Sequence, residues 1–499
     1  MTTPTAATRR SPRSLRDAWI ALAGLSAVFL FEMLDNSILN VALPTIGRDL
    51  HANTTSLQWV TGSYAVVFGG LMLLFGAIAD RFGRRRVMLV GLLLLAVVSL
   101  GTLFVSSIGE LIAIRVAMGV AAAMTTPGSM ALAFRLFGDD GTRVRAINLI
   151  STVGLIGLAV GPTAGGLLLA VAPWQVLLLV NVPIALLAFA GILTGIAPDV
   201  ATDLHRVPLD LAGAALGTGT VVLALVAPTL FVDEGAGSWM PWAVAAAAVV
   251  AGASFAVRQR TARHPLLDLR LIARPLVSSG LAFKAAAGLA IAALGFLVTL
   301  QLQLAWGWSP AAASLGMLPQ VIVLIAGGAI VSPFVRRVGL GRAAWISAGA
   351  VVVGLAVWTV LGSLGYVWVA LALALVAAGL RVVGVVAGTN VLRGLPANRT
   401  TIGAALVDTA SEVTTGVGIA VAGTVLAALV GGDITSSWTA AQSAGFQEGA
   451  LIAGAVVTAI AAVLVTVGFL RARAGDAAVA APDAAPATGP VPDAAADPA

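Results

Sequence analysis

The stretch Gly76–Val87, GAIADRFGRRRV, joins two long apolar runs and decides how the chain is organised. It places one acid, Asp80, and four arginines in a connection too short to form a domain. Basic residues beside an apolar run mark the cytoplasmic side of a membrane helix. The stretch therefore predicts two membrane helices joined by a short cytoplasmic loop.

The composition of the whole chain is that of a membrane protein. The 499 residues are 59% hydrophobic and 10% charged, whereas a soluble globular protein carries about 25% charged residues. The chain has no cysteine, which excludes disulfides and thiolate chemistry. Its three histidines fall between the apolar runs, which argues against a metal centre in the membrane. Most of the arginines lie between spans, so the net charge of +6 does not indicate nucleic-acid binding.

Fourteen apolar runs are each long enough for a membrane helix, which needs about 20 residues. A β-barrel is excluded because the polar–apolar alternation of barrel strands is missing. We expect an all-α polytopic membrane protein with fourteen helices, at 18–40, 57–79, 87–107, 110–134, 146–170, 175–197, 209–231, 239–258, 276–303, 311–334, 343–363, 366–391, 402–430 and 448–470.

The arginines support this count, because with fourteen spans almost all of those in the loops fall on one side. The opposite side receives only Arg48. Both termini are therefore expected in the cytoplasm. Lys284 is the only lysine among 28 basic residues, a bias typical of GC-rich bacterial genomes, so the expected location is a bacterial plasma (inner) membrane.

A weaker echo of the first loop, PFVRRVGLGR at 333–342, also follows an even-numbered span. It suggests a duplicated arrangement of two six-helix halves with an insertion between them. The tail is rich in Ala, Pro and Asp and is expected to be disordered. The expected parts are a cytoplasmic segment 1–17, a first bundle 18–197, an inserted helix pair with a cytoplasmic loop 198–275, a second bundle 276–470 and a tail 471–499.

The first loop resembles the signature G-x-x-x-D-R-x-G-R-R-R of the major facilitator superfamily. The matching positions are Gly76, Asp80, Arg81, Gly83, Arg84 and Arg85. Four further stretches resemble the fourteen-helix drug:proton antiporters of that superfamily: LDNSILNVALP (Leu34–Pro44), LIAIRVAMGVAAAMTTP (Leu111–Pro127), GLIGLAVGPTAGG (Gly154–Gly166) and PWQVLLLVNVPIALL (Pro173–Leu187). The chain departs from these patterns at Ser37, Met118, Val120 and Leu178.

The resemblance gives two of these motifs a role in conformational change. Gly157, Gly161 and Gly165 share one helix face and would let another helix approach closely, while Pro162 favours a bend and Gly166 completes the motif. Within the family, this motif is associated with exporters. The alternative interpretation is ordinary packing of glycines between membrane helices. The loop motif is expected to act as a latch between states, with Asp80 at a neighbouring helix end and arginines on anionic headgroups. The alternative is a plain cytoplasmic anchor.

Seven ionisable residues fall inside the spans, where each is a functional candidate because an unpaired charge in the membrane is costly. The resemblance implies that the first, fourth, ninth and twelfth spans line a substrate cavity, and each of these carries a charge. Depth along the helices suggests one pair, Asp35 with Arg115, and a second between Arg381 and two acids on one helix face. The seven are Glu32, Asp35, Arg115, Lys284, Arg381, Asp408 and Glu412.

Proton coupling is the role expected for Asp35 with Arg115, because burial raises a carboxyl pKa and a nearby cation lowers it. Glu32 would serve as a relay or as a site for a cationic substrate. The alternative is a permanent structural pair. Asp408 and Glu412 would act in gating or carry protons. If Lys284 faces the cavity, it would disfavour strongly cationic substrates or bind an acidic one; the alternative is chance retention.

The expected function is proton-driven export of small amphiphilic compounds such as drugs or antibiotics. The expected protein is monomeric, surrounded by lipid, and uses the proton gradient without cofactor or metal. One alternative is a dedicated exporter of a single endogenous metabolite or self-made antibiotic. Another is a non-transporting sensor, for which loops and tail offer no signalling domain. An enzyme or ATP-driven pump is disfavoured, because the sequence has no P-loop, metal-ligand cluster or nucleophile–histidine set.

Overall fold

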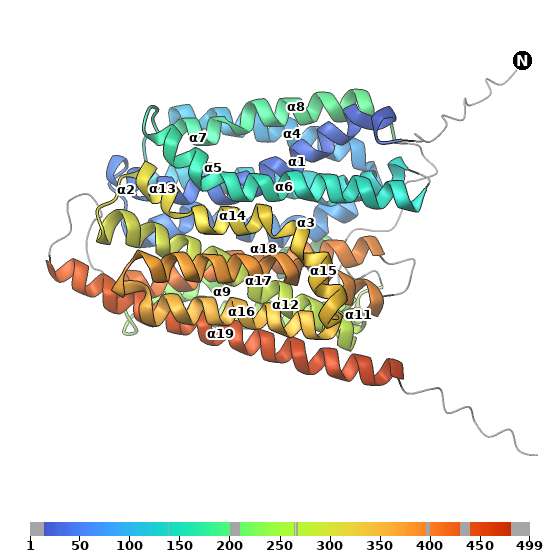
Figure 1. Ribbon diagram of the computed structural model, residues 1–499. Coiled ribbons are helices and arrows are strands. Elements are labelled where there is room, and N and C mark those ends of the chain that lie inside the picture. Colours follow the sequence, from blue (N-terminus) through green and yellow to red (C-terminus); the bar gives the residue numbers. More distant parts are fainter. Residues whose placement is uncertain are drawn as a thin grey trace, which may run out of the picture.

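The computed structural model describes residues 14–137, 139–199, 210–263, 265, 268–395, 400–429 and 440–480. Helices are the only regular elements in these ranges, and the long ones lie side by side along one direction (Figure 1). The expectations for residues 1–13 and 481–499 concern positions outside the described ranges. Residues 471–480 were expected in a disordered tail, but they continue the last helix, α19 (Ala440–Ala480).

The described residues of the first half form eight α-helices in the order of the expected first six spans. A capping box starts α5: Ser107 accepts a hydrogen bond from Glu110 N, and the Glu110 carboxylate accepts one from Ser107 N. The helices are α1 (Trp19–Ile38), α2 (Leu43–Asp49), α3 (Thr54–Phe82), α4 (Arg84–Gly101), α5 (Ile108–Leu136), α6 (Asp140–Leu169), α7 (Gln175–Leu179) and α8 (Asn181–Gly195), and the 3₁₀ turn η2 (Leu39–Ala42) joins α1 to α2.

The inserted pair is a hairpin on the outside of the molecule. α9 (Leu211–Asp233) packs on α3 and also on α18 (Thr400–Leu429) of the second half, whereas α10 (Trp239–Thr261) packs chiefly on α9. The ends of the hairpin are joined by an ion pair in which Arg258 Nε lies 2.6 Å from Asp210 Oδ1. The insertion therefore contacts both halves through α9.

The second half follows a short helix, α11 (Leu269–Ile272), and meets the first half along two lines. α3 packs against α18, and α6 packs against α13 and α14. The elements are α12 (Pro275–Leu300), the π-helical turn η5 (Gln301–Ala305), α13 (Pro310–Gly316), α14 (Leu318–Ala326), α15 (Gly328–Val338), α16 (Leu340–Leu361), α17 (Tyr366–Gly394), α18 and α19.

Each of the fourteen expected segments contains helix in the structure, but they are not fourteen unbroken spans. Twelve described helices are long and apolar enough to cross a membrane, and α3 adds a span bent by 49°. The tenth expected span, 311–334, is divided among α13, α14 and α15. Pro319 lacks the N–H that would continue α13, and the pair Gly327–Gly328 weakens the next turn. These residues account for both interruptions.

Candidate functional site

A cavity of about 570 Å³ lies between the two halves. The first half lines it with residues of α1 and α6, and the second half with residues of α12, α14, α15, α17 and α18. Lys284, Arg381 and Glu412 are the charged residues of this lining within the described part of the chain. Glu32 and the whole of α5 are not among the described lining residues, although both were expected there.

The cavity is closed at the end of the molecule where α1 ends and α3 begins, called here the outer end. Gln303 Nε2 of η5 donates a 2.7 Å hydrogen bond to the Val41 carbonyl of η2. Nearby, Gly166 of α6 packs against Pro310 and Ser314 of α13 with no room for a Cβ. These contacts join opposite halves, so the outer end is sealed in this conformation.

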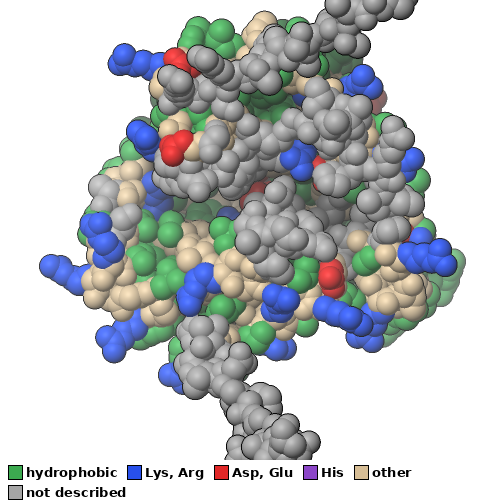
Figure 2. All heavy atoms as spheres, turned by 90° about the vertical axis from the view of Figure 1, so that its right-hand side faces the viewer, with side chains coloured by type: hydrophobic (Ala, Val, Ile, Leu, Met, Phe, Trp, Pro, Cys, Tyr) green, Lys and Arg blue, Asp and Glu red, His purple; other side chains and the backbone are tan. Residues whose placement is uncertain are grey.

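The opposite end, where α1 begins and α19 ends, carries the arginines of the two basic loops and is called here the arginine end. Figure 2 views this end directly: blue side chains surround the face, and the surface is hollowed at its centre. The contacts described above therefore close the cavity at the outer end, whereas the hollow lies at the arginine end.

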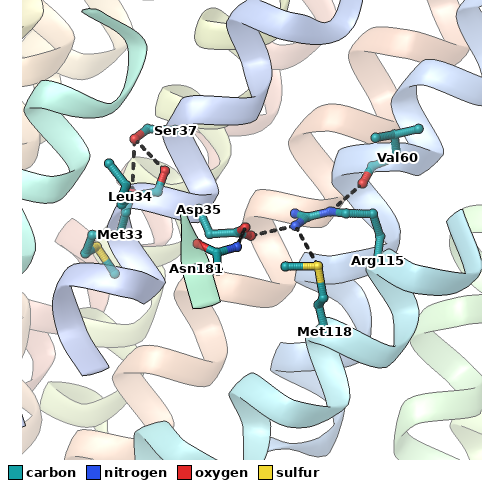
Figure 3. Close-up of polar contacts among 8 residues, drawn as sticks. All are labelled: Met33, Leu34, Asp35, Ser37, Val60, Arg115, Met118 and Asn181. Atoms are coloured by element: carbon teal, nitrogen blue, oxygen red, sulfur yellow. Dashed lines mark hydrogen bonds and ion pairs between the residues drawn. The ribbon is translucent and has the colours of Figure 1, made fainter. Parts of the chain in front are cut away.

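Asp35 and Arg115, the first predicted pair, are in direct contact inside the first half (Figure 3). Arg115 Nη1 lies 2.6 Å from Asp35 Oδ2, and the two side chains are 1% and 0% exposed. The second carboxylate oxygen accepts a 2.8 Å hydrogen bond from Asn181 Nδ2 of α8. The site thus draws α1, α5 and α8 together around one carboxylate.

Arg115 has further partners on α3 that hold its guanidinium in place. Its Nε donates a 2.9 Å hydrogen bond to the Val60 carbonyl, and its guanidinium carbon lies 4.4 Å from the centre of the Tyr64 ring. Neither partner could be found from the sequence, because a backbone carbonyl and one aromatic residue in an apolar helix carry no signal. Asn181 did carry a signal, since it lies in the stretch Pro173–Leu187 that resembles the drug:proton antiporters.

The chemistry available to this cluster is a change of charge coupled to movement. A proton on Asp35 would remove the counter-charge of a buried guanidinium, and leaving one partner of a buried pair alone is strongly unfavourable. We therefore expect protonation of Asp35 to favour a shift of α1 relative to α5, which stays a prediction. Cluster and cavity share α1: Met33 and Ser37 line the cavity, and Asp35 between them points to Arg115.

Glu32 lies between α1 and α5, 3% exposed, where Oε2 accepts a 2.8 Å hydrogen bond from Thr126. Its predicted role as a proton relay stays a prediction. A direct role in the cavity lining is not supported by this position.

The glycine motif of α6 permits the close helix approach that the sequence predicted. A Cβ on Gly157 would lie 2.9 Å from the Leu30 carbonyl, and one on Gly165 would lie 2.8 Å from Ile38 Cγ1. Gly161 between them meets Ser37. These three glycines pack against α1, whereas the adjacent Gly166 packs against α13 of the other half. Pro162 of the same motif lines the cavity.

The loop motif is held within the first half in this conformation. Asp80 Oδ1 lies 2.7 Å from Arg84 Nε, and Gly76 packs on Pro127 of α5. Gly83 ends α3 with φ of +108°. Asp199 caps the N-terminus of α4 by accepting hydrogen bonds from Arg85 N and Arg86 N. The Arg81 side chain lies over the Phe82 ring, and the Arg85 side chain donates a hydrogen bond to the Leu193 carbonyl. The expected contact of Asp80 with a neighbouring helix end is not seen here, and the latch remains a prediction.

The second predicted pair is not formed within the described part of the chain. No ion pair within 4 Å joins Arg381 to Asp408 or Glu412. The Arg381 guanidinium instead lies against Gly328, at the break between α14 and α15, where the missing side chain leaves room for it. Lys284 faces the cavity and is close enough to Glu32 and Asp408 for electrostatic attraction.

Sequence comparison finds exporters and resistance proteins among the relatives. The chain is 34% identical over 348 residues to the cephamycin export protein CmcT of Amycolatopsis lactamdurans, covering 68% of this chain and 70% of that protein. It is 35% identical to the multidrug efflux pump LfrA of Mycolicibacterium smegmatis (66% and 64% covered) and 33% identical to a puromycin resistance protein of Streptomyces alboniger (63% and 62%). The matches to these last two thus span less than two thirds of their length.

The fold is also found among solved structures. A bacterial homologue of the human lysosomal transporter Spinster, in an inward-facing and unoccupied conformation, has a TM-score of 0.63 at 16% identity, covering 92% of this chain and 98% of that one. The sequence model of the protein family described as Major Facilitator Superfamily matches residues 25–208 of the chain. Taken with the loop signature and the cavity between two helical halves, these matches show that the chain belongs to the major facilitator superfamily.

Proposed function

We propose that the protein is a proton-coupled antiporter that exports small amphiphilic compounds, drugs or antibiotics among them, across the bacterial plasma membrane. The observation that carries the proposal is the position of α1. This helix lines the cavity with Met33 and Ser37, and between them it carries Asp35, which forms the buried ion pair with Arg115 of α5. A proton reaching Asp35 would release α1 from α5 and change the cavity wall.

The proposed direction of transport follows from the orientation of the protein in the membrane. We place the arginine end in the cytoplasm, because basic loops are retained there, so both termini are cytoplasmic and the hollow in Figure 2 opens inward. The protein would load its substrate from the cytoplasm, bind protons from outside, and work as a monomer without a cofactor. The names of the relatives, which include an export protein and an efflux pump, support this direction.

The test is transport by the purified protein in liposomes under an imposed pH gradient, with a panel of dyes and antibiotics. Wild type should move several compounds only when the gradient is present, and Asp35→Asn should abolish the dependence on the gradient. Asp268→Asn, a matched change at the start of α11, should behave as wild type. Equal transport without a gradient would contradict proton coupling. Transport of a single compound would favour a dedicated exporter, and no transport would favour a sensor.

A further inference from the structure

We propose that the cavity takes anionic or zwitterionic amphiphiles, whose acidic group binds Arg381 with the help of Lys284. This rests on the proposed export function and names the substrate class of the same site. The class is a small molecule with a carboxylate, or an acid of similar shape, attached to an apolar frame.

The guanidinium of Arg381 is available to bind a ligand. It lines the cavity from α17 and is half-buried, and the structure gives it no hydrogen bond or ion pair within the described residues. An uncompensated cation inside the membrane is costly, so such residues mark ligand sites. Arginine presents a planar fork of N–H donors that fits a carboxylate with two parallel hydrogen bonds.

The wall opposite this guanidinium is built to admit it. The helix is interrupted at Gly327, and a Cβ on Gly328 would collide with Arg381 Nη2. A Cβ on Gly327 would lie 3.8 Å from Arg381 Cγ. The glycines at the break between α14 and α15 therefore leave room for the Arg381 guanidinium at the edge of the cavity.

The charge balance of the described lining favours an acid. Lys284 and Arg381 contribute two positive charges and Glu412 contributes one negative charge. Lys284 has no ion pair within 4 Å in the described residues, although Glu32 and Asp408 lie within electrostatic range. Glu32 and Asp408 already attract Lys284, so the acidic group of a substrate would pair chiefly with Arg381, which has no counter-charge within the described residues.

The remaining wall is apolar and suits the rest of such a molecule. Met33, Leu155, Leu158, Ile291 and Leu380 line the same cavity. Its volume of about 570 Å³ falls within the range of about 300–1,000 Å³ found for small-molecule sites. An amphiphile can therefore place its acid at Arg381 and its frame along these side chains.

Two dyes test the proposal, because they share one frame and differ only in whether its carboxyl group is free or esterified. Rhodamine 110 has a free carboxyl group, and rhodamine 123 is its methyl ester on the same frame. Binding would be measured by fluorescence polarisation with the full chain in nanodiscs of uncharged phosphatidylcholine. Wild type should bind rhodamine 110 about tenfold more tightly, the effect of one charge-assisted contact. Arg381→Gln should reduce this preference to about twofold or less, and Lys284→Gln should weaken it.

Controls separate binding from folding and from transport. Arg381→Lys keeps the cation and should keep most of the preference, and Arg393→Gln, which removes an exposed arginine of the same helix outside the lining, should keep all of it. Equal binding of the two dyes, preference for the ester, binding of neither, or a preference that survives Arg381→Gln would overturn the proposal. This assay needs no gradient, so a wild-type preference without gradient-driven transport would count against the export function alone.

Discussion

Substitution of Gly166 by alanine should shift the protein from the present conformation towards one open at the outer end. Gly166 of α6 faces α13 across the two halves, and the Pro310 carbonyl oxygen lies 2.5 Å from where a Cβ would stand. Ordinary contact begins at 3.4 Å, so the halves must separate by roughly 1 Å, and overpacking of this kind costs about 1–3 kcal/mol. The conformational ratio should change by roughly 5- to 150-fold.

The neighbouring glycine supplies a matched control. A Cβ on Gly165 would lie 2.8 Å from Ile38 Cγ1 and 2.9 Å from the Ile38 carbonyl, both on α1 of the same half. Gly165→Ala should therefore lower thermal stability by a similar free energy without changing the ratio of conformations, because α1 and α6 stay together in both.

The assay uses the absence of cysteine from the chain. Spin labels at Val171→Cys and Leu364→Cys, which are 84% and 69% exposed on opposite halves, would report the distance across the outer end by double electron–electron resonance. Gly166→Ala should enlarge the long-distance population and Gly165→Ala should not. If both variants shift it equally, or if only Gly165→Ala does, the reasoning about a contact specific to one state is refuted.

Three further substitutions test other contacts. Gly83→Ala should destabilise the protein by about 1–3 kcal/mol in thermal unfolding, because φ of +108° is unfavourable for alanine, whereas Gly341→Ala, which meets no atom within 4 Å, should have little effect. Gln58→Leu removes a 3.1 Å hydrogen bond to Thr229 of α9 and a 3.4 Å hydrogen bond to Thr424 of α18. The population with a long spin-label distance should therefore grow about fivefold, which corresponds to about 1 kcal/mol. An unchanged distribution would argue that these bonds do not hold the outer end closed. Asn181→Leu removes a donor to Asp35 and should cut gradient-driven transport about tenfold, while unchanged transport would make the amide incidental.

The sequence predicted the features that depend on patterns along the chain. The spans followed from hydropathy, the close approach of another helix to α6 followed from glycines spaced four apart, and the Asp35–Arg115 pair followed from two costly charges at matching depth. In each case the physical cause lies in residue type and spacing. The direct contact of Asp35 with Arg115 was therefore predictable, and its expected role in proton coupling stays a prediction.

Features that depend on three-dimensional packing were not predictable. The Val60 carbonyl and the Tyr64 ring hold Arg115, and any helix offers many carbonyls of the same kind. Arg381 was assigned to acids at the same depth, but depth does not say which way a side chain points. The glycines at 327 and 328 decided its place, since they gave the guanidinium room on another helix.

Proton release on substrate binding is the measurement that tests the central claim most directly, namely that the Asp35–Arg115 pair couples protons to transport. Purified protein in weakly buffered solution would be mixed with a dye that it transports, and a pH indicator would record released protons. Wild type and Glu412→Gln should release protons, and Asp35→Asn should release none while still binding the dye. Release that persists in Asp35→Asn and disappears in Glu412→Gln would contradict the account and move the coupling site into the cavity.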